Sequence, residues 1–398
     1  MSTSHPPLSV VPMVNFAEFT AKSYSYLGRK HVADQIDQAL RQVGFVYLVN
    51  HGIPQQAVNE CAELVSSMRI LPSYHAPSAS NSCNFQSFRF FHLPHETKLV
   101  ASRPQRSSLH GGYSCLAEKT VSQNAFDESA IAYLREPGDF NESFECFRPG
   151  ENSQPNNWPV DQARPGFRKC IEDFFWHCSL LLHQVLTALE VALGLPIKYL
   201  RHLHSQNNHQ LRLLHYPSIR TRLLDLATWN RFSAHCDVGT LSLIFQDLVE
   251  GLEIEDPHAP GQFRPVPIVP GGVLVNVGRL LARWSNDRWK STVHRVGASP
   301  EDKERAEADA NAICKPRFSV VFFGTPDREA SIDALPGCWD DTNPKRYTEV
   351  KVGDYIQMTT TVLYPEKQSG DGPAPTSTTP TNDENYRYIE QRASSPRG

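Results

Sequence analysis

Apolar residues recur at helical spacing in two stretches of the first half of the chain. In "RKHVADQIDQALRQVGF" they return every three or four positions, which predicts an amphipathic helix that ends at Gly44. The run "FVYLVN" that follows predicts a strand, and residues 55–68 predict a second helix. A longer apolar stripe over Phe167–Leu193 predicts a long helix with one buried face, which Gly194 ends.

After Gln210 the pattern changes to short strand-like runs, separated by turn signals and without predicted helices between them. These runs are "LRLLHYP", "GTLSLIFQ", "LEIED", "FRPVPIV", "GGVLVNVG", "STVHRVG", "RFSVVFFG" and "DYIQMTTTVL". Serial short strands are typical of a sandwich or a barrel. Upstream, "PMVNFAEF" predicts a short strand and a turn, "LHGGYS" predicts a turn into a strand, and residues 73–91 lack periodicity and predict a loop that is a candidate lid.

The predicted fold class is therefore mainly β with bracing helices, organised in three parts. Residues 1–205 form a region of helices and strands that braces the core and supplies walls of a pocket. Residues 206–365 form the β core. Residues 366–398 are rich in Pro, Ser, Thr and Gly, which predicts a tail that is disordered in large part.

Composition and charge exclude several classes of protein. The 398 residues are 40% hydrophobic and 21% charged, which is typical of a chain with a substantial core. The formal net charge of −4 argues against a nucleic-acid partner, and no apolar run is long enough to span a membrane. The N-terminus does not resemble a signal peptide, and the nine scattered cysteines contain no CxxC pair. We therefore expect free thiols and a cytoplasmic protein, and we expect a monomer.

The segment "SAHCDVGTLSLIFQD" carries the first candidate chemistry. Residues i and i+2 of a strand point to the same face, so His235 and Asp237 would share a face while Cys236 points away. This geometry suits a metal ion, and it also suits an ordinary salt bridge. His294 lies in a later strand, and two histidines with one carboxylate can bind ferrous iron and leave sites open. For His294 alone, a buried histidine bonded to a neighbour is the simpler interpretation.

The strand "RFSVVFF" adds a guanidinium and a hydroxyl on one face, from Arg317 and Ser319. A buried arginine must be paired, and arginine binds carboxylates through two parallel hydrogen bonds. The partner would be either an Asp or Glu of the protein or the distal carboxylate of a small diacid that chelates the metal with its other end.

With these motifs together, the sequence resembles the isopenicillin N synthase-like family of iron- and 2-oxoglutarate-dependent dioxygenases, of the type found in fungal specialised metabolism. The resemblance covers about Val11–Pro365. It rests on "VGFVYLVNHGIP", "FFHLPHETK", "LRLLHYP", "HCDVGTLSLIFQD", "PGGVLVNVGRLLARWSNDRWKSTVHRV" and "RFSVVFF".

The resemblance implies a distorted double-stranded β-helix, or jelly roll, braced by the long helix. It implies an oxidoreductase that couples decarboxylation of 2-oxoglutarate to oxidation of a substrate C–H bond, with Fe(II), 2-oxoglutarate and O2 as cofactors and co-substrates and ascorbate as a candidate reductant. The implied site residues are His235, Asp237 and His294 for iron, and Arg317, Ser319 and Tyr216 for 2-oxoglutarate.

The sequence departs from the family pattern at three places. Leu214 stands where the family often has asparagine, and Arg279 stands where aspartate is common. The 298–315 segment is longer than the usual hairpin, and its charged composition predicts a solvated excursion; a role in covering the substrate is the alternative.

Two rival functions remain open at this point. A relative of the same fold can hold the carboxylate of its own substrate with Arg317 and Ser319 and use no 2-oxoglutarate, and a catalytically silent jelly-roll binding protein is the more distant alternative. The substrate is expected to be a small, largely apolar molecule that undergoes hydroxylation, desaturation or ring rearrangement. Candidate walls of its pocket are Tyr113, Phe232, Phe323 and the segment near Leu363.

Overall fold

The computed structural model describes residues 11–62, 86–103, 111–115, 139–150, 155–163, 165–225 and 230–363. Its elements are β1 (Met13–Asn15), α1 (Ala17–Thr20), α2 (Tyr26–Gln42), β2 (Phe45–Val49), α3 (Gln55–Ala62), α4 (Gln86–Phe91), α5 (His95–Leu99), β3 (Gly112–Ser114), β4 (Glu142–Phe147), α7 (Phe167–Leu193), α8 (Tyr199–His202), β5 (Gln210–Tyr216), β6 (Ile219–Arg220), α9 (Thr221–Asp225), β7 (Phe232–His235), β8 (Leu241–Gln246), β9 (Leu252–Asp256), β10 (Ala259–Pro265), β11 (Val273–Val277), α10 (Arg279–Trp284), β12 (His294–Val296), α11 (Pro300–Ala308), β13 (Ile313–Cys314), β14 (Arg317–Phe323), β15 (Ser331–Ile332), β16 (Val350–Lys351) and α12 (Val352–Leu363). Within this described part, every helix is too short or too polar to cross a membrane.

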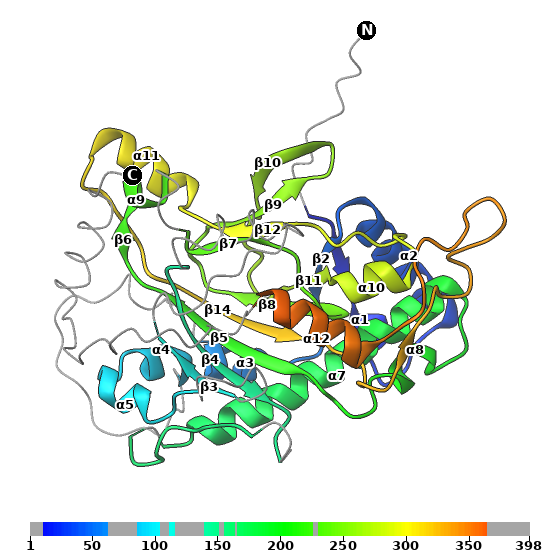
Figure 1. Cartoon of the computed structure of the whole chain (residues 1–398), viewed down its shortest axis with the longest axis horizontal. Coiled ribbons are helices and arrows are strands. Elements are labelled where there is room, and N and C mark those ends of the chain that lie inside the picture. The colour runs from blue at the N-terminus through cyan, green and yellow to red at the C-terminus, as the bar shows by residue number, and fades with distance from the viewer. Residues whose placement is uncertain are drawn as a thin grey trace, which may run out of the picture.

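A large sheet and a small sheet pack against each other around an apolar interior (Figure 1). The large sheet has eight strands in the order β1-β2-β11-β8-β14-β5-β4-β3, and the small sheet has four in the order β10-β9-β12-β7. Phe232, Ile254 and Val296 of the small sheet join the same buried cluster as Leu214 and Val321 of the large sheet. This two-sheet arrangement agrees with the predicted jelly roll.

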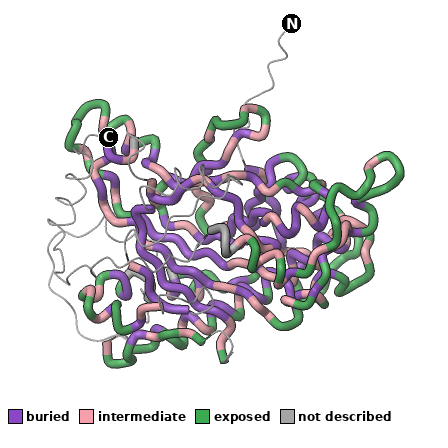
Figure 2. Tube along the Cα trace, in the orientation of Figure 1, coloured by how far each residue is buried: buried purple, intermediate pink, exposed green. Residues whose placement is uncertain are grey.

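Strand alternation decides which side of the large sheet each residue contacts. On β5, Leu214 and Tyr216 face the interior between the sheets, whereas Leu211 and Leu213 belong to the cluster on the opposite side. The central strands are buried on both sides along most of their length, and Figure 2 draws them mainly as purple tubes. A central strand can therefore supply the interior with polar side chains and the outer core with apolar ones.

Helix α7 covers the outer face of the large sheet, and its bounds are those that the apolar stripe predicted (Figure 1). Phe174 packs edge-on against Phe245 of β8, and Phe175 packs against Phe322 of β14 in the same way. Gly194 adopts a φ of 66° at the end of the helix, a conformation that glycine reaches without a steric cost. The helix is therefore the outer layer of the fold.

Two predicted segments were wrong in type. The predicted 73–91 loop contains helix α4, because Phe90 packs with Tyr113 and Phe144 and stabilises the short helix through tertiary contacts. The run "DYIQMTTTVL" is part of helix α12 rather than a strand. The β-branched residues suggested a strand, but the hydroxyl of Thr359 donates to the carbonyl of Tyr355 one turn earlier, which satisfies it within the helix.

The connections between the core strands also contain three short helices, α9, α10 and α11, which the pattern did not predict. Helix α11 lies in the 298–315 segment and begins at Ser299, whose hydroxyl accepts from the backbone N–H of Asp302. Strand β13 of the same segment pairs with β6. This segment is therefore an ordered helix and strand, and most residues of α11 are exposed, in agreement with the predicted solvated excursion.

Strands β1 to β4 come from the 1–205 region and hydrogen-bond into the same sheet as the strands that follow residue 205. The remaining predicted segments, residues 63–68, residues 73–85 and the 366–398 tail, lie outside the described residues. The division at residue 205 therefore separates parts of one sheet.

His204 anchors the loop that leads from the small sheet to β8. Its ring is fully buried, with Nδ1 donating to the carbonyl of Leu200 at 2.8 Å and Nε2 lying 2.9 Å from the hydroxyl of Thr240. Because the Nδ1 carries the proton, Nε2 accepts from Thr240 and the ring is neutral. Burial lowers the pKa of His204 to about 4.

We predict that His204 contributes to acid unfolding. Its pKa is near 6.5 in the unfolded chain and about 4 in the folded chain, so the folded state binds fewer protons and loses stability as the pH falls from 6.5 towards 4. The loss amounts to about 3 kcal/mol. The variant His204→Gln should show a flatter dependence of unfolding free energy on pH across this window, measured by urea titration at each pH. An unchanged slope would contradict the assignment.

Candidate metal centre

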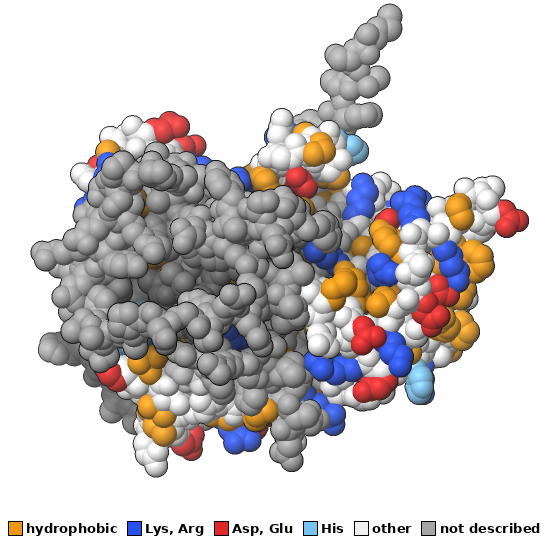
Figure 3. Space-filling view, in the orientation of Figure 1, with side chains coloured by type: hydrophobic (Ala, Val, Ile, Leu, Met, Phe, Trp, Pro, Cys, Tyr) orange, Lys and Arg blue, Asp and Glu red, His pale blue; other side chains and the backbone are white. Residues whose placement is uncertain are grey.

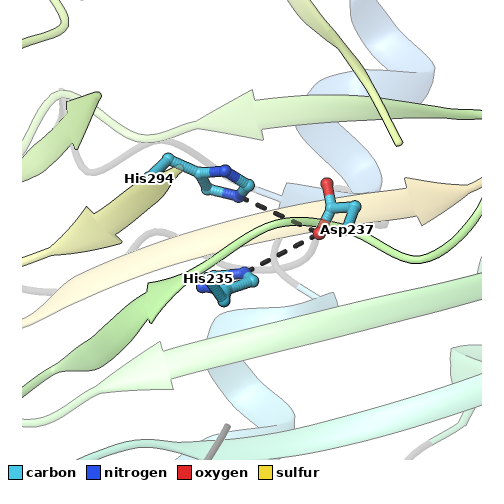
Figure 4. Close-up of side chains that lie close together, drawn as sticks. All are labelled: His235, Asp237 and His294. Atoms are coloured by element: carbon cyan, nitrogen blue, oxygen red, sulfur yellow. Dashed lines mark ion pairs between the residues drawn. The ribbon is translucent and has the colours of Figure 1, made fainter. Parts of the chain in front are cut away.

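His235 and His294 occupy paired positions on neighbouring strands of the small sheet. His235 ends β7, and His294 begins β12 directly opposite it in the antiparallel ladder. The ring centroids lie 4.3 Å apart, and both side chains are buried (Figure 4). The register therefore brings together two imidazoles that are far apart in the sequence.

Asp237 follows β7 and points its carboxylate at both rings (Figure 4). Its Oδ1 lies 3.7 Å from Nε2 of His235 and 3.9 Å from Nε2 of His294. Its Oδ2 accepts hydrogen bonds from the hydroxyl of Ser242 at 2.6 Å and from the amide of Asn276 at 2.7 Å. These bonds hold Oδ2, and Oδ1 faces the two imidazole nitrogens.

The hydrogen bonds of the two rings fix which nitrogen carries a proton. Nδ1 of His235 lies 2.7 Å from the carbonyl of Ser233, and Nδ1 of His294 lies 3.2 Å from the carbonyl of Thr292. A carbonyl only accepts, so each Nδ1 is the donor and each Nε2 presents a lone pair. Burial lowers the pKa of His235 to about 3, which keeps this lone pair available at neutral pH.

The carboxyl group of Asp237 remains ionised although it is buried. Burial alone would raise its pKa, but His294, His235 and the hydrogen bonds from Asn276 and Ser242 together lower it below its ordinary value. Two imidazoles and one carboxylate, with ligand atoms within 4.8 Å of one another, match the donor set of a ferrous site with open positions. Among the described residues, no other group of three histidine, cysteine or acidic side chains has this geometry.

The loop after Asp237 is held by close backbone contacts that require glycine. A Cβ on Gly239 would lie 2.4 Å from the carbonyl oxygen of Gly324, and a Cβ on Gly278 would lie 2.1 Å from that of Gly239. The backbone N–H of Arg279 also donates to the carbonyl of Asp237 at 2.8 Å. The carboxylate is therefore held on a loop with little freedom to move.

Arg317 lies on the interior face of β14, opposite Tyr216 of β5, and is almost completely buried. Its guanidinium donates to the side-chain carbonyl of Gln246 at 2.9 Å and to the backbone carbonyl of Val249 at 3.2 Å, while its carbon lies 5.1 Å from the centre of the Tyr216 ring. One terminal nitrogen, Nη1, has no hydrogen-bond partner among the described residues. A buried guanidinium with a free donor fits a carboxylate ligand.

Asp247 is the nearby carboxylate that could have paired with Arg317, and it is engaged elsewhere. It accepts from the backbone N–H groups of Phe318 at 2.6 Å and Val249 at 3.0 Å. Burial raises its pKa to about 6, although the charge of Arg317 opposes the rise. The expected alternative, a protein Asp or Glu bound to Arg317, is therefore not found among the described residues.

The predicted substrate contacts lie on two different sides of the large sheet. The ring of Phe232 lies 4.4 Å from that of His235, and Phe323 packs against the same interior cluster. Tyr113 instead belongs to the outer cluster, where its hydroxyl donates to Glu142 at 2.5 Å. Ser319 is buried on β14 in register with Leu214 and faces the interior, as Arg317 does.

Two of the three departures from the family pattern, Leu214 and Arg279, have local explanations. Leu214 is buried in the interior cluster and supplies apolar surface where an amide was expected. The side chain of Arg279 interacts with the thiol of Cys236, which also donates to the carbonyl of Ser291 at 3.4 Å. Cys236 therefore points away from the metal ligands, as strand alternation predicted.

Sequence reasoning did not identify Asn276, Ser242 and Gln246 as site residues. Each is a polar residue in an otherwise apolar strand, within "VLVNV" and "LSLIFQ". A polar side chain inside a fully buried strand must find a partner, and this signal could have identified them.

Fold and donor set together define a mononuclear non-haem metal oxygenase, and comparison with known proteins agrees. Residues 207–326 match the 2OG-Fe(II) oxygenase superfamily, and residues 11–73 match the N-terminal region of the non-haem dioxygenases in morphine synthesis. The chain belongs to the 2OG-Fe(II) oxygenase superfamily, so it is an oxidoreductase that uses Fe(II) and 2-oxoglutarate, as the resemblance implied.

Several similar proteins are fungal. Proline hydroxylase buaE of Petromyces alliaceus is 33% identical over 312 residues, which cover 78% of this chain and 86% of that protein. The 2-oxoglutarate-dependent dioxygenase htyE of Aspergillus rugulosus is 34% identical over 285 residues, 70% of this chain and 85% of that one. A full-length Neurospora crassa protein, crystallised in complex with alpha-KG, is 28% identical, with a TM-score of 0.72 over 90% of this chain and 98% of that chain.

We predict that Asp237→Ala abolishes Fe(II) binding while the fold survives, at a stability cost of about 1–3 kcal/mol for the two donors left without a partner. Metal content after anaerobic loading and circular dichroism measure the two effects. Cys236→Ser is the matched control, since its thiol points away, and it should retain iron. Iron bound by the Asp237→Ala protein would contradict the assignment.

We predict that Asn276→Leu weakens metal binding about tenfold to a hundredfold, because it removes a donor that orients and ionises the ligand carboxylate. Competition between the protein and a chelator for Mn(II) gives the affinity. Ser291→Ala, which removes a buried hydroxyl that bonds to no described residue, should leave the affinity unchanged. Equal affinities for Asn276→Leu and the unmodified protein would exclude this role of the amide.

Proposed function

We propose that His235, Asp237 and His294 hold the iron and that Arg317 binds the distal carboxylate of 2-oxoglutarate. The observation that carries this proposal is the free donor of a buried guanidinium that faces the interior between the two sheets, together with a preformed set of two imidazoles and one carboxylate on the small-sheet side of that interior. Ser319, two residues from Arg317 on this face, would donate its hydroxyl to the same carboxylate. Tyr216 packs against the guanidinium and limits its movement.

In this reaction the protein would bind and orient the co-substrate and the substrate, and it would exclude water from the site. Fe(II), when bound, supplies activation of O2 coupled to decarboxylation of 2-oxoglutarate to succinate and CO2. Arg317 and Ser319 would fix the co-substrate by a charge-assisted fork and a hydroxyl, which sets the position of its reacting end. The apolar interior cluster around Phe232 would keep water away from the reacting C–H bond.

The proposed substrate is a small, largely apolar organic molecule, oxidised at a C–H bond by hydroxylation, desaturation or ring rearrangement. Phe232 supports this proposal because its ring lies beside that of His235, and Phe323 adds aromatic surface to the same interior cluster. One relative is named a proline hydroxylase, and one crystal structure of the Neurospora crassa protein holds thymine with alpha-KG, so small ring compounds have a precedent.

The proposed setting is specialised metabolism in the cytoplasm, with the protein acting as a monomer on free small molecules. On the face shown in Figure 3, basic and acidic side chains of the described residues are interspersed, which does not suggest a nucleic-acid surface. Comparing metabolites with and without the gene, together with release of succinate by the purified protein, would identify the substrate and test the proposed reaction.

An alternative role for Arg317 is to hold a carboxylate of the organic substrate instead of that of 2-oxoglutarate. We predict that Arg317→Lys raises the apparent constant for 2-oxoglutarate about tenfold to a hundredfold, because a single point charge replaces the fork at a cost of about 1.5–3 kcal/mol. The constant for the organic substrate should change little, and Ser319→Ala should act in the same direction more weakly.

Arg295→Lys is the control for this prediction. Arg295 pairs with Glu253 at 2.7 Å and is partly exposed, so its replacement should leave both constants unchanged. If Arg317→Lys raised only the constant for the organic substrate and left that for 2-oxoglutarate unchanged, the alternative role of Arg317 would be favoured.

A further inference from the structure

A second group of polar side chains lies on the interior face of the large sheet, at the β3-β4-β5 end. Arg212 of β5 is in register with Val321 on one side and with Glu145 of β4 on the other. Ser143 of β4 is in register with Ser114 of β3. Strand alternation gives all four polar residues the same face as Tyr216 and Arg317, which is the face towards the small sheet and the metal ligands.

Three polar atoms of this group have no hydrogen-bond partner among the described residues. They are the hydroxyl oxygens of Ser114 and Ser143 and the Nε of Arg212. The exposed fractions of these residues are 2%, 1% and 7%. Buried polar groups are nearly always satisfied, so three together indicate a missing partner with acceptor atoms.

The charge of Arg212 is only partly compensated. Its Nε lies 3.5 Å from Oε1 of Glu145, while Oε2 of Glu145 accepts from Gln210 at 2.8 Å and lies 3.7 Å from a guanidinium nitrogen of Arg103. One carboxylate therefore stands between two guanidinium groups. A buried positive charge that shares its carboxylate partner with a second guanidinium favours an anionic ligand.

This group lies one aromatic ring away from the metal ligands. The guanidinium carbon of Arg212 lies 5.4 Å from the centre of the Phe232 ring, and that ring lies 4.4 Å from the ring of His235. A ligand held by Arg212 would therefore rest its apolar part against Phe232 and reach the metal side of the interior.

We propose that Arg212, Ser143 and Ser114 form an anchor for a carboxylate of the organic substrate. This inference rests on the proposed function and adds the chemical class: a small carboxylic acid whose apolar part packs on Phe232. Arg317 and Arg212 then serve different carboxylates, that of 2-oxoglutarate and that of the substrate. Because the two carboxylates are bound separately, a second and incompletely paired guanidinium, that of Arg212, is needed on the same interior face as Arg317.

The test measures binding without turnover. The full-length protein is loaded with Mn(II) and 2-oxoglutarate and dialysed to equilibrium against a mixture of small cyclic carboxylic acids, each paired with its primary amide. Mass spectrometry then measures which compounds are retained. The unmodified protein should retain one or more acids and not the matching amides, since an amide cannot offer two charged oxygens to a guanidinium.

Three variants and a control separate anchoring from folding. Arg212→Met should reduce retention of the acids about tenfold to a hundredfold, and Arg212→Lys should have a smaller effect. Ser143→Ala should weaken retention several-fold while its melting temperature stays equal or rises, because a buried unsatisfied hydroxyl is removed. Arg264→Met, at a partly exposed arginine paired with Asp256, should change nothing.

Equal retention of acids and amides, retention of no acid, or unchanged retention by Arg212→Met would each overturn the anchor. Binding of 2-oxoglutarate is measured in the same samples and should be the same in all variants. If the unmodified protein binds no 2-oxoglutarate but retains acids in a manner that depends on Arg212, the proposed function fails and the anchor stands.

Discussion

The site depends on how the two oxygens of Asp237 are used. Asn276 and Ser242 bond to one oxygen, so the other faces the Nε2 atoms of His235 and His294. Without these donors a carboxylate in an apolar interior would favour its neutral form and lose its value as a ligand. Since the donors come from β8 and β11 of the large sheet and the imidazoles from the small sheet, the metal centre requires both sheets to be correctly packed.

Alternation along the central strands allows this chemistry to coexist with a continuous core. On β14 the odd-numbered positions from Arg317 face the interior, while Phe318, Val320 and Phe322 pack in the cluster that includes α7. A shift of register by one residue would exchange the two sets and bury the guanidinium against α7. Burial of the outer set therefore also fixes the orientation of the interior set.

The sequence predicted the parts of the structure that depend on local pattern. The bounds of α7, the short core strands and the sharing of a face by His235 and Asp237 follow from periodicity alone. It failed at helix α4, which depends on the long-range packing of Phe90. It also failed at α12, where β-branched residues suggested a strand but the hydroxyl of Thr359 bonds within the helix. The pairing of His294 with His235 also required the family resemblance, because register between distant strands is not encoded in a local pattern.

The two halves of the chain contribute different chemistry to the same interior. The strands after residue 205 supply the metal ligands and Arg317, whereas β3 and β4 extend the large sheet and add Ser114, Ser143 and Glu145 beside Arg212. Iron and 2-oxoglutarate are common to the superfamily, so residues that hold them are constrained by a shared reaction. Residues on β3 and β4 are free of that constraint. With the proposed anchor at this end of the sheet, change there would alter which substrate is oxidised while the reaction itself is kept.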